Sequence, residues 1–430
     1  MESSSGKIFF RNGWLADVEQ GRLVRGELLV EGDRIAAIAP QISCPAAQII
    51  DLADKILAPG FIDLHTHLRE PGYEYKETIA SGAQAAAAGG FTTIACMPNT
   101  NPPLDTPERV VWVKEQARAT SVVKVLPIGA ISLEQAGRQT TDFEGLQASG
   151  AVAFSDDGRG VMSSRVMLEA LQASRRLSVP IMAHEEDGEL AGSGSINAGP
   201  ISEQLGDPGI PAAAEYTMLA RDLYLAELTG GHLHVCHVSA AESVNLIRAA
   251  KARGVKVTAE VTPHHLHLTD RVVPSLLGQA KVNPPLRSEA DRQALLTGVV
   301  DGTIDIIATD HAPHASREKE VPLSQAAFGF SGLEVAFAVA QAALVHSSLM
   351  SLEKMLAALT CRPADILGLP QGRLKVGAPA DLVVLDPHKR WRVSANELRS
   401  QGKNTPYLDQ ELVGKVLLTM VDGRIVYREG

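Results

Sequence analysis

The sequence has few cysteines and few aromatic residues, and it lacks both a long apolar run and a basic cluster. Its four cysteines are scattered without a Cys-x-x-Cys pair, which argues against a disulfide framework and against a cysteine-ligated zinc. No apolar stretch reaches the roughly 18 residues that a membrane-spanning helix needs. The net charge of −10 is spread along the chain, so we expect neither nucleic acid nor an anionic membrane surface as a partner.

The N-terminal residues MESSSGKIFF also lack the pattern of a secretion signal, in which basic residues precede an apolar stretch. We therefore expect a cytoplasmic protein with reduced, mostly buried thiols. Hydrophobic residues make up 45% of the chain and charged residues 21%, which is ordinary for a soluble enzyme. A length of 430 residues leaves room for a large α/β barrel with a smaller appendage.

Both ends of the chain have the pattern of short strands joined by turns. Near the N-terminus, residues 8–11, 26–30 and 35–38 are β-rich, and Asn12-Gly13 and Glu31-Gly32-Asp33 are typical turn sequences. The same pattern returns at 381–385 and at 416–427, where Asp422-Gly423 predicts a hairpin turn. We expect the two ends, residues 1–56 and 370–430, to pair into one small β domain.

The middle of the chain, residues 57–369, alternates short β-rich runs with helical patterns rich in Ala and Leu. Eight runs predict strands, at 61–65, 92–97, 122–128, 151–155, 180–184, 233–237, 255–261 and 304–309. The clearest helical patterns lie at 77–88, 107–119, 165–176, 213–228 and 241–253. This repeat predicts a (β/α)8 barrel of the TIM type, whose chemistry takes place at the carboxyl ends of its strands.

Side chains that commonly bind metals stand at the ends of five of these predicted strands. The first strand ends in His65 and His67, which share one face of an extended backbone. The others are Asp156 and Asp157 after the fourth strand, His184 after the fifth, His237 after the sixth, and Asp310 and His311 after the eighth. One catalytic zinc usually takes three protein ligands, so even four of these histidines with two of the carboxylates exceed one such site and predict two divalent ions. Such a pair lowers the pKa of bound water and polarises a substrate oxygen, which suits amide hydrolysis or its reverse.

Several motifs resemble those of the bacterial class I dihydroorotases, a branch of the amidohydrolase superfamily. They are DLHTHLREPG, CMPNTNPP, FSDDG, HVCHVS, KVNPPLR, ATDHAPH and FGFSGLE, and the late stretch NTPYLDQELVGKV extends the resemblance over essentially the whole chain. The resemblance implies a zinc-dependent enzyme that reversibly cyclises N-carbamoyl-L-aspartate to L-dihydroorotate in pyrimidine (UMP) biosynthesis.

The resemblance also implies roles for individual residues. His65, His67 and Asp310 would hold one Zn²⁺, His184 and His237 the other, and Asp157 would bridge the two ions together with a hydroxide. The residues implied to contact substrate are His67, Arg69, Asn99, Asn283, His314 and the backbone of Phe328 and Gly329. The planar donors of an arginine suit the substrate carboxylate, and asparagines offer the donor and acceptor that a cyclic ureide needs. We expect Asp310 also to move the proton during catalysis.

The bridging ligand distinguishes this chain from relatives that open hydantoins and dihydropyrimidines, which use a carboxylated lysine. No lysine occurs between Lys124 and Lys251, so that bridge cannot form here. The resemblance assigns the bridge to Asp157. By the residues alone Asp156 is an equal candidate, and the aspartate that does not bridge could orient a neighbour.

The remaining histidines and cysteines in these strands have simpler interpretations. We expect His264, His265 and His267 to be structural or to support the ligands, and His232 and His234 to face away from His237 because their strand parity is opposite. Cys96 and Cys236 lie in apolar strands and are expected to be buried, inert thiols.

Two other functions remain open at this point. One is hydrolysis of another cyclic ureide, as by a dihydropyrimidinase or an allantoinase, against which Arg69, the MPNT stretch and the missing lysine count. The other is an inactive subunit bound to aspartate carbamoyltransferase, although this chain keeps all six ligand positions. We expect a homo-oligomer, with residues 313–329 covering the substrate.

Overall fold

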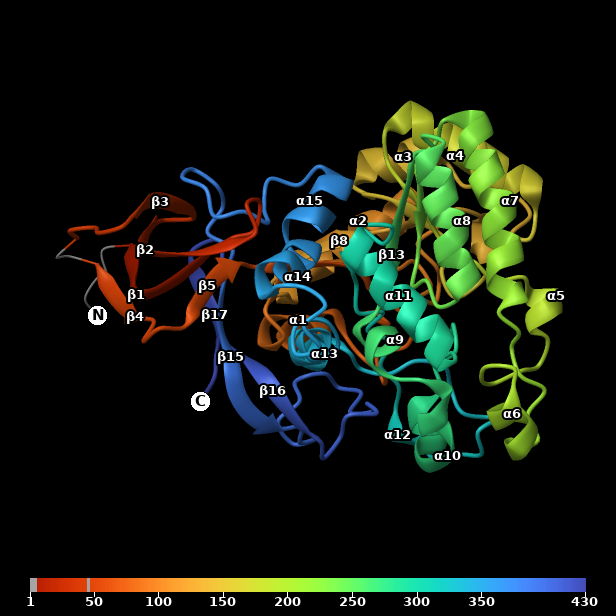
Figure 1. Cartoon of the computed structure of the whole chain (residues 1–430). Helices are drawn as coiled ribbons and strands as arrows, with labels where there is room; N and C mark the ends of the chain where they lie inside the picture. Colours follow the sequence, from red (N-terminus) through yellow and green to blue (C-terminus); the bar gives the residue numbers. More distant parts are fainter. Residues whose placement is uncertain (1–5, 45–46) are drawn as a thin grey trace.

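Strands from both chain ends form one mixed sheet in the computed structural model, which describes residues 6–44 and 47–430 and has an α/β fold (Figure 1). The sheet order is β17-β16-β15-β5-β1-β2-β3, and β4 pairs with β1. The bounds are β1 (Lys7–Asp17), β2 (Arg22–Glu31), β3 (Arg34–Ala39), β4 (Gln48–Asp51), β5 (Ile56–Pro59), β15 (Leu382–Arg392), β16 (Glu411–Val421) and β17 (Arg424–Arg428). The expected pairing of the two chain ends is therefore present.

The two ends meet where β15 runs antiparallel to β5, with Leu382 opposite Pro59. Phe10, Leu28 and Met420 are fully buried in the core that these strands share. Because β5 begins at Ile56, a domain boundary between residues 56 and 57 would cut through a strand. The division of the chain into domains stays a prediction, and the prediction about the N-terminal ten residues falls partly on residues 1–5, outside the described part.

One turn prediction in this sheet is wrong. Asn12 and Gly13 do not join two strands but lie inside β1, where the pairing with β2 shifts between Phe10 and Gly13. Asn12 has a φ of 58°, and this preference for the left-handed region serves a bulge as well as a hairpin turn. The turns predicted at Gly32 and at Asp422-Gly423 are confirmed, since they join β2 to β3 and β16 to β17.

The eight runs predicted in the middle of the chain form two parallel sheets. One contains β6 (Phe61–Thr66), β7 (Phe91–Cys96) and β8 (Lys124–Pro127). The other has the order β14-β13-β12-β11-β10-β9, with β9 (Gly129–Ala130), β10 (Phe154–Ser155), β11 (Ile181–Ala183), β12 (Leu233–Val235), β13 (Val257–Val261) and β14 (Ile306–Ile307). The predicted strand 122–128 corresponds to β8, and the chain changes sheet directly after it, at β9. The Ile128 amide donates to the carbonyl of Cys96 on one side, and the Gly129 amide donates to that of Ala153 on the other.

Hydrogen bonds also join the ends of the first and last strands of these sheets. Thr66 and His311 form a parallel bridge, and the His67 amide donates to the His311 carbonyl at 2.8 Å. Earlier in the same two segments, the Asp63 carboxylate accepts from the Thr309 hydroxyl at 2.5 Å. The carboxyl end of β6 therefore lies beside the segment that follows β14.

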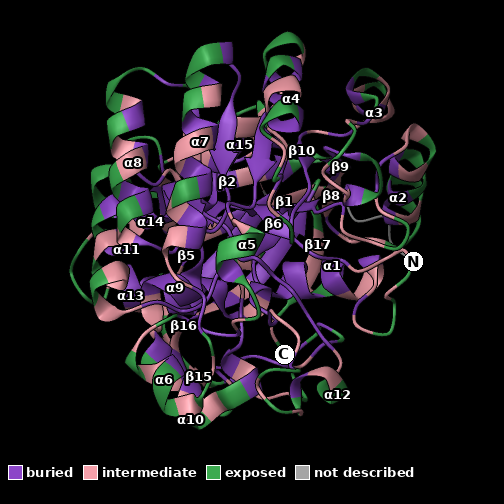
Figure 2. Ribbon diagram, turned by 90° about the vertical axis from the view of Figure 1, so that its right-hand side faces the viewer, coloured by how far each residue is buried: buried purple, intermediate pink, exposed green. Residues whose placement is uncertain are grey.

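Helices cover the outside of the parallel strands, and their outer faces are exposed while their inner faces are buried (Figure 2). The five predicted helices are α1 (Ile79–Ala88), α2 (Pro107–Thr120), α4 (Ser164–Leu177), α7 (Ala213–Thr229) and α8 (Ala241–Ala252). Others of similar size are α3 (Phe143–Ser149), α11 (Glu289–Asp301), α13 (Ala336–Leu344), α14 (Leu352–Leu359) and α15 (Cys361–Leu367). Short helices in connecting segments are α5 (Gly188–Ala191), α6 (Pro200–Leu205), α9 (Pro263–His267), α10 (Val273–Leu276) and α12 (Ser316–Lys319). In the described ranges no helix has both the length and the apolar character needed to cross a bilayer.

Side-chain caps explain where two of these helices begin. The Thr78 hydroxyl accepts from the amide of Ser81, and the Ser81 hydroxyl accepts from the amide of Thr78, so α1 begins after the predicted Glu77. Ser163 likewise accepts from the amide of Val166 at the start of α4. Glu77 is left outside the helix and accepts from the Gln401 amide and the Ser400 hydroxyl. The cap thus frees Glu77 to anchor the C-terminal segment beside the site.

Candidate metal centre and active site

A cavity of about 130 Å³ opens at the carboxyl ends of the parallel strands. Ten of the twelve predicted site residues line it, and the two that do not, His65 and His314, contact its lining. His65 Nε2 lies 3.3 Å from Asp157 Oδ1, and His314 Nε2 lies 3.3 Å from Arg69 Nη2. The lining residues are His67, Arg69, Asn99, Asp157, Gly158, His184, His237, Asn283, Asp310, Ala312, Phe328 and Gly329.

The six predicted ligands fall into two groups, each close enough to hold one ion. The first group is His65, His67 and Asp310, and the second is Asp157, His184 and His237. Within each group the nitrogen and carboxylate oxygen atoms lie within 4.8 Å of one another. The grouping of His65 and His67 with Asp310, and of His184 with His237, matches the prediction.

Asp157 faces both groups. Its Oδ1 lies 3.5 Å from Nε2 of His237, and its Oδ2 lies 3.4 Å from Nε2 of His67. Asp156 instead turns to the preceding strand, where its carboxylate accepts from the amides of Ile131 and Ser132 at 2.9 and 3.0 Å. Hydrogen bonds near residue 131 thus hold the Asp156 carboxylate away from the two ligand groups, and the assignment of the bridge to Asp157 stays a prediction.

The donors in this cavity fit divalent cations. His65 Nε2 and Asp157 Oδ1 are buried and have no hydrogen-bond partner among the described residues, which is unfavourable for a polar atom unless an ion contacts it. Burial alone would raise the pKa of Asp157, but His65, His184 and His237 hold this pKa well below its usual range. Ionised carboxylates with imidazoles form a donor set that suits zinc and other divalent metals.

Cys236 lies nearer to the centre than the sequence indicated. With His65 and Asp157 it forms a third group of possible ligands. Burial raises the pKa of its thiol well above the ordinary value, which keeps the sulfur protonated and a weak ligand in the metal-free protein. Its burial is as predicted, and its inertness stays a prediction.

Three site residues have an unusual backbone conformation. Arg69, His237 and Asp310 have φ angles of 63°, 30° and 47°. Residues other than glycine rarely adopt the left-handed region, and those that do are concentrated at functional sites. The strain at these three positions turns their side chains into the cavity at the ends of three different strands.

Hydrogen bonds orient the first group of ligands. His67 Nδ1 donates to Asn99 Oδ1 at 2.9 Å, which leaves its Nε2 facing Asp310 Oδ1 at 3.0 Å. His65 Nδ1 donates to Glu260 Oε1 at 2.5 Å. Sequence analysis missed Glu260, although a glutamate within an otherwise apolar strand was an available signal. Contacts of this kind set the imidazole tautomer and strengthen it as a ligand.

The opposite wall of the cavity carries cationic and neutral donors. His314 Nε2 donates to the Phe328 carbonyl at 2.7 Å, so its Nδ1 accepts from Lys76 Nζ at 3.3 Å. Burial, together with Arg69, Lys76 and Lys319, lowers the pKa of His314 to about 2, so this imidazole is neutral. Arg69 uses Nε to donate to the Pro313 carbonyl at 3.2 Å, which leaves its Nη groups for an anionic ligand.

Two residues that sequence analysis missed hold the segment 313–329 in place. Lys319 Nζ donates to the carbonyls of Lys281, Ala327 and Gly329 at 3.0, 2.7 and 2.7 Å. Asn404 donates to the Gly329 carbonyl at 3.1 Å and accepts from the His314 amide at 3.0 Å. Asn404 begins the late stretch NTPYLDQELVGKV, so the C-terminal part of the chain shapes the substrate wall.

The other histidines lie outside both ligand groups. His265 bonds to the Thr262 hydroxyl and to the Pro284 carbonyl, His264 packs edge-on against Phe330, and His267 stacks near Tyr407. These contacts agree with the structural interpretation of the three. His232 and His234 bond to Thr258 on the neighbouring strand.

Comparison with known proteins places the chain in a family. The family described as "Dihydro-orotase-like" matches residues 54–243, and the "Amidohydrolase family" matches residues 232–427. A dihydroorotase from Syntrophus aciditrophicus (strain SB) is 49% identical over 425 residues, covering 98% of this chain and 100% of that protein. One from Anoxybacillus flavithermus is 47% identical, covering 96% of each. The chain belongs to the dihydroorotase family.

The fold of this dihydroorotase-family chain extends to cyclic-amide hydrolases outside the family. The L-hydantoinase (dihydropyrimidinase) from Arthrobacter aurescens has a TM-score of 0.89 with 26% sequence identity, and the match covers 98% of this chain and 96% of that one. The match supports an α/β hydrolase of cyclic amides.

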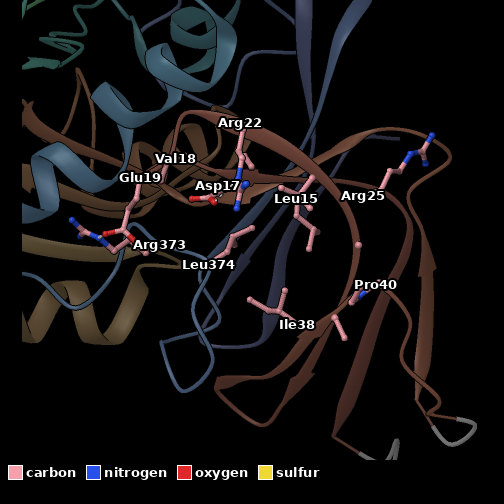
Figure 3. A pocket seen from close by; sticks show the side chains of 14 residues that line it. Leu15, Asp17, Val18, Glu19, Arg22, Arg25, Ile38, Pro40, Arg373 and Leu374 are labelled. Carbon is pink, nitrogen blue, oxygen red and sulfur yellow. Dashed lines mark hydrogen bonds and ion pairs between the residues drawn. The ribbon is translucent and has the colours of Figure 1, made fainter.

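A second cavity of this dihydroorotase-family chain, about 280 Å³, lies in the mixed sheet, far along the chain from the ligand groups (Figure 3). Leu15, Ile38 and Leu374 form its apolar part. Its charged side chains already have oppositely charged partners: Arg22 with Asp17, Arg373 with Glu19 and Asp365, and Arg25 with Asp54. The cavity at the strand ends, with its buried unpaired ligand atoms, is the better candidate site.

Proposed function

We infer that this chain is a dihydroorotase, which interconverts L-dihydroorotate and N-carbamoyl-L-aspartate in pyrimidine biosynthesis. Relatives named dihydroorotase match nearly its full length at 45–49% identity. The observation that carries the inference is the cavity itself: five ligand-type side chains line it together with Arg69, and the sixth, His65, contacts Asp157 in its lining. An arginine suits the carboxylate of dihydroorotate, which hydantoin and dihydrouracil lack.

We propose that His65, His67 and Asp310 hold one Zn²⁺, that His184 and His237 hold the second, and that Asp157 bridges them. The proposal is supported by the two ligand groups and by the unpaired Asp157 Oδ1. Two ions held in this way would lower the pKa of bound water and polarise the substrate carbonyl.

The remaining groups bind the substrate and handle its proton. Arg69 and Asn99 would take the substrate carboxylate. In support, Arg69 Nη1 has no hydrogen-bond partner among the described residues, and Asn99 uses only its oxygen on His67. Asn283 and the backbone of Phe328 and Gly329 line the side where the ureide would lie. As a hydroxide attacks the ring amide carbon, Asp310 would accept the proton of that hydroxide and return it to the ring nitrogen when the C–N bond breaks. His67, His65 and His237 hold the pKa of Asp310 below its ordinary value against the effect of burial, so it begins as the base.

We also propose that residues 57–369 form a closed (β/α)8 barrel and that residues 1–56 and 370–430 form the small β domain. Closure is supported at both junctions between the parallel sheets. At one junction Thr66 forms a bridge with His311. At the other, the amides of Ile128 and Gly129 donate to Cys96 of one sheet and to Ala153 beside the other. A cytoplasmic location, a homo-oligomer and an aspartate carbamoyltransferase partner stay predictions.

Turnover by the purified chain, supplied with Zn²⁺, tests the proposed function. We expect hydrolysis of L-dihydroorotate and cyclisation of N-carbamoyl-L-aspartate, with far lower activity on 5,6-dihydrouracil, hydantoin and allantoin. Preference for a substrate without a carboxylate would identify a different cyclic-ureide hydrolase. Absence of turnover in a folded, metal-loaded protein would instead support the inactive subunit.

A further inference from the structure

A chain of hydrogen bonds runs through the inside of the parallel strands and ends on the metal ligand His65. His232 Nε2 lies 2.8 Å from Thr258 Oγ1, which lies 2.8 Å from His234 Nδ1. His234 Nε2 lies 3.1 Å from Glu260 Oε2, and Glu260 Oε1 lies 2.5 Å from His65 Nδ1. His65, His234 and Glu260 are fully buried, so water cannot replace a missing link.

The strand pattern explains why these side chains meet. His232 directly precedes β12 and lies two residues before His234, and Thr258 and Glu260 are two residues apart along β13, so each pair shares a face. The strands are parallel neighbours with His234 opposite Thr258. The opposite parity that turns His234 away from the ligand position of His237 therefore directs it toward Glu260.

The carboxylate of Glu260 fixes which atom donates in each of these hydrogen bonds. An ionised carboxylate only accepts, and Glu260 receives N–H groups from His65, from His234 and from the backbone of His237 at 3.2 Å. His234 must then carry its proton on Nε2, so its Nδ1 accepts the Thr258 hydroxyl proton. The Thr258 oxygen in turn accepts from His232 Nε2. Burial, with His234 and Lys256 nearby, lowers the pKa of His232 to about 3, which keeps it in the neutral form this order requires.

The series of hydrogen bonds begins at His232, near the amino ends of the strands and away from the metal ligands at their carboxyl ends. His232 precedes β12, and together with Thr258 it lines a surface cavity of about 600 Å³ with Lys256, Asp305 and Arg362. His65 closes the inner end, with Nε2 directed at Asp157. A continuous series of hydrogen-bonded side chains thus connects the two ends of the strands.

We propose that His234, with Thr258 and His232 behind it, is a positioning residue of the metal centre. It holds Glu260 so that Glu260 fixes the Nδ1–H tautomer of His65 and presents His65 Nε2 to the ion. Side chains near the amino ends of the strands would then contribute to the affinity for divalent cations. This inference rests on the metal centre proposed above and does not depend on which cyclic amide is the substrate.

The reason that His234 matters is the burial of Glu260. Without the His234 donor, Glu260 Oε2 would be a buried carboxylate oxygen with no partner in the described structure, a state that costs more than the bond itself contributes. The carboxyl group would relax by turning or by binding a proton, and either change removes the acceptor for His65 Nδ1. Loss of such an indirect contact typically lowers metal affinity by about 10–100-fold.

Zn²⁺ affinity of the full-length, metal-free protein, measured by competition with a chromophoric chelator, tests the proposal. We expect His234→Leu to weaken Zn²⁺ binding by about 10–100-fold. His234→Gln keeps an N–H for Glu260 and an oxygen for Thr258, so it should recover most of that loss. Thr258→Val removes the hydroxyl at nearly constant volume and should give an intermediate loss. The matched control is Thr93→Val, because the Thr93 hydroxyl is also buried in a strand but has no hydrogen-bond partner among the described residues.

A second measurement separates positioning from general damage. In the Zn²⁺-saturated protein labelled with ¹⁵N-histidine, two-bond ¹H–¹⁵N spectra should report the Nδ1–H tautomer for His65 and the Nε2–H tautomer for His234. The His65 tautomer should be lost in His234→Leu and kept in His234→Gln. Wild-type affinity and an unchanged His65 tautomer in His234→Leu would overturn the proposal. If that variant does not fold, wild-type affinity in Thr258→Val would overturn it equally. Failure of the wild-type protein itself to bind Zn²⁺ would instead refute the metal centre.

Discussion

Oδ1 of Asp157 lies 3.3 Å from Nε2 of His65 and 3.6 Å from Nδ1 of His184, so one carboxylate oxygen faces a histidine of each ligand group. These histidines come from β6 and from the end of β11, on different parallel sheets. A side chain in this position can bridge two ions. Asp156, one residue earlier, is occupied by the backbone near residue 131.

Asp157→Ala should therefore release at least one of two bound ions and abolish turnover, as measured by metal analysis of the purified variant. Asp156→Ala is the contrast: it should lower the unfolding temperature but keep the metal stoichiometry of the folded fraction. Because no lysine is available for carboxylation, added bicarbonate should not alter the activity of the wild type. Unchanged stoichiometry and activity in Asp157→Ala would show that the bridge lies elsewhere.

Arg69→Met should raise KM for L-dihydroorotate steeply, because it removes the charged partner of the substrate carboxylate. The expected loss of binding is about 2–5 kcal/mol for a desolvated charge pair. Arg317→Met is a suitable control, since Arg317 is an exposed arginine of the neighbouring segment 313–329. Equal kcat/KM of the wild type for dihydroorotate and 5,6-dihydrouracil would contradict a role for Arg69 in selectivity.

Asp310→Asn should keep most of the bound metal and reduce turnover by about 10²–10⁴-fold in both directions, the range for general acid–base catalysis. The amide can still contact an ion through its oxygen but cannot relay a proton. Steady-state rates in the two directions and metal analysis of the same sample provide the test. Near-normal turnover with metal in place would assign the proton transfer to another group, such as His314.

His314 should make the folded protein sensitive to acid. Its pKa is lowered from 6.5 to about 2, so below about pH 6.5 the unfolded chain binds a proton that the folded chain does not. The stability contributed by the neutral imidazole is present above pH 6.5 and is lost as the pH falls toward 2. Between pH 6 and 5 the wild type should lose about 1 kcal/mol more unfolding free energy than His314→Asn.

Denaturant unfolding of the metal-free proteins at both pH values measures this difference, and the absence of metal removes competition from ligand protonation. His388→Asn serves as the control because His388 is exposed. An equal loss of stability in the wild type and in His314→Asn would mean that His314 is not held neutral in the folded state.

The sequence by itself determined the strand–helix order of the middle of the chain and the ends of strands at which ligands occur. Both follow from local pattern, because His65, His184 and His237 each end a short apolar run and parallel strands bring such ends to one edge. It also determined that the two chain ends are β-rich. It did not determine that Asn12-Gly13 is a bulge, because its left-handed preference suits a bulge and a turn alike.

Only the tertiary structure decided which residues support the site. Asp156 and Asp157 are adjacent in the sequence, but only Asp156 accepts from the backbone amides of Ile131 and Ser132, whereas Asp157 faces the two ligand groups. Glu260 and His234 came together because β12 and β13 are paired in one register, and Lys319 reached Gly329 only through the folded course of its segment. These contacts join residues that are far apart in the sequence, and no local sequence pattern predicts them. A hydrogen bond depends on the final positions of both partners.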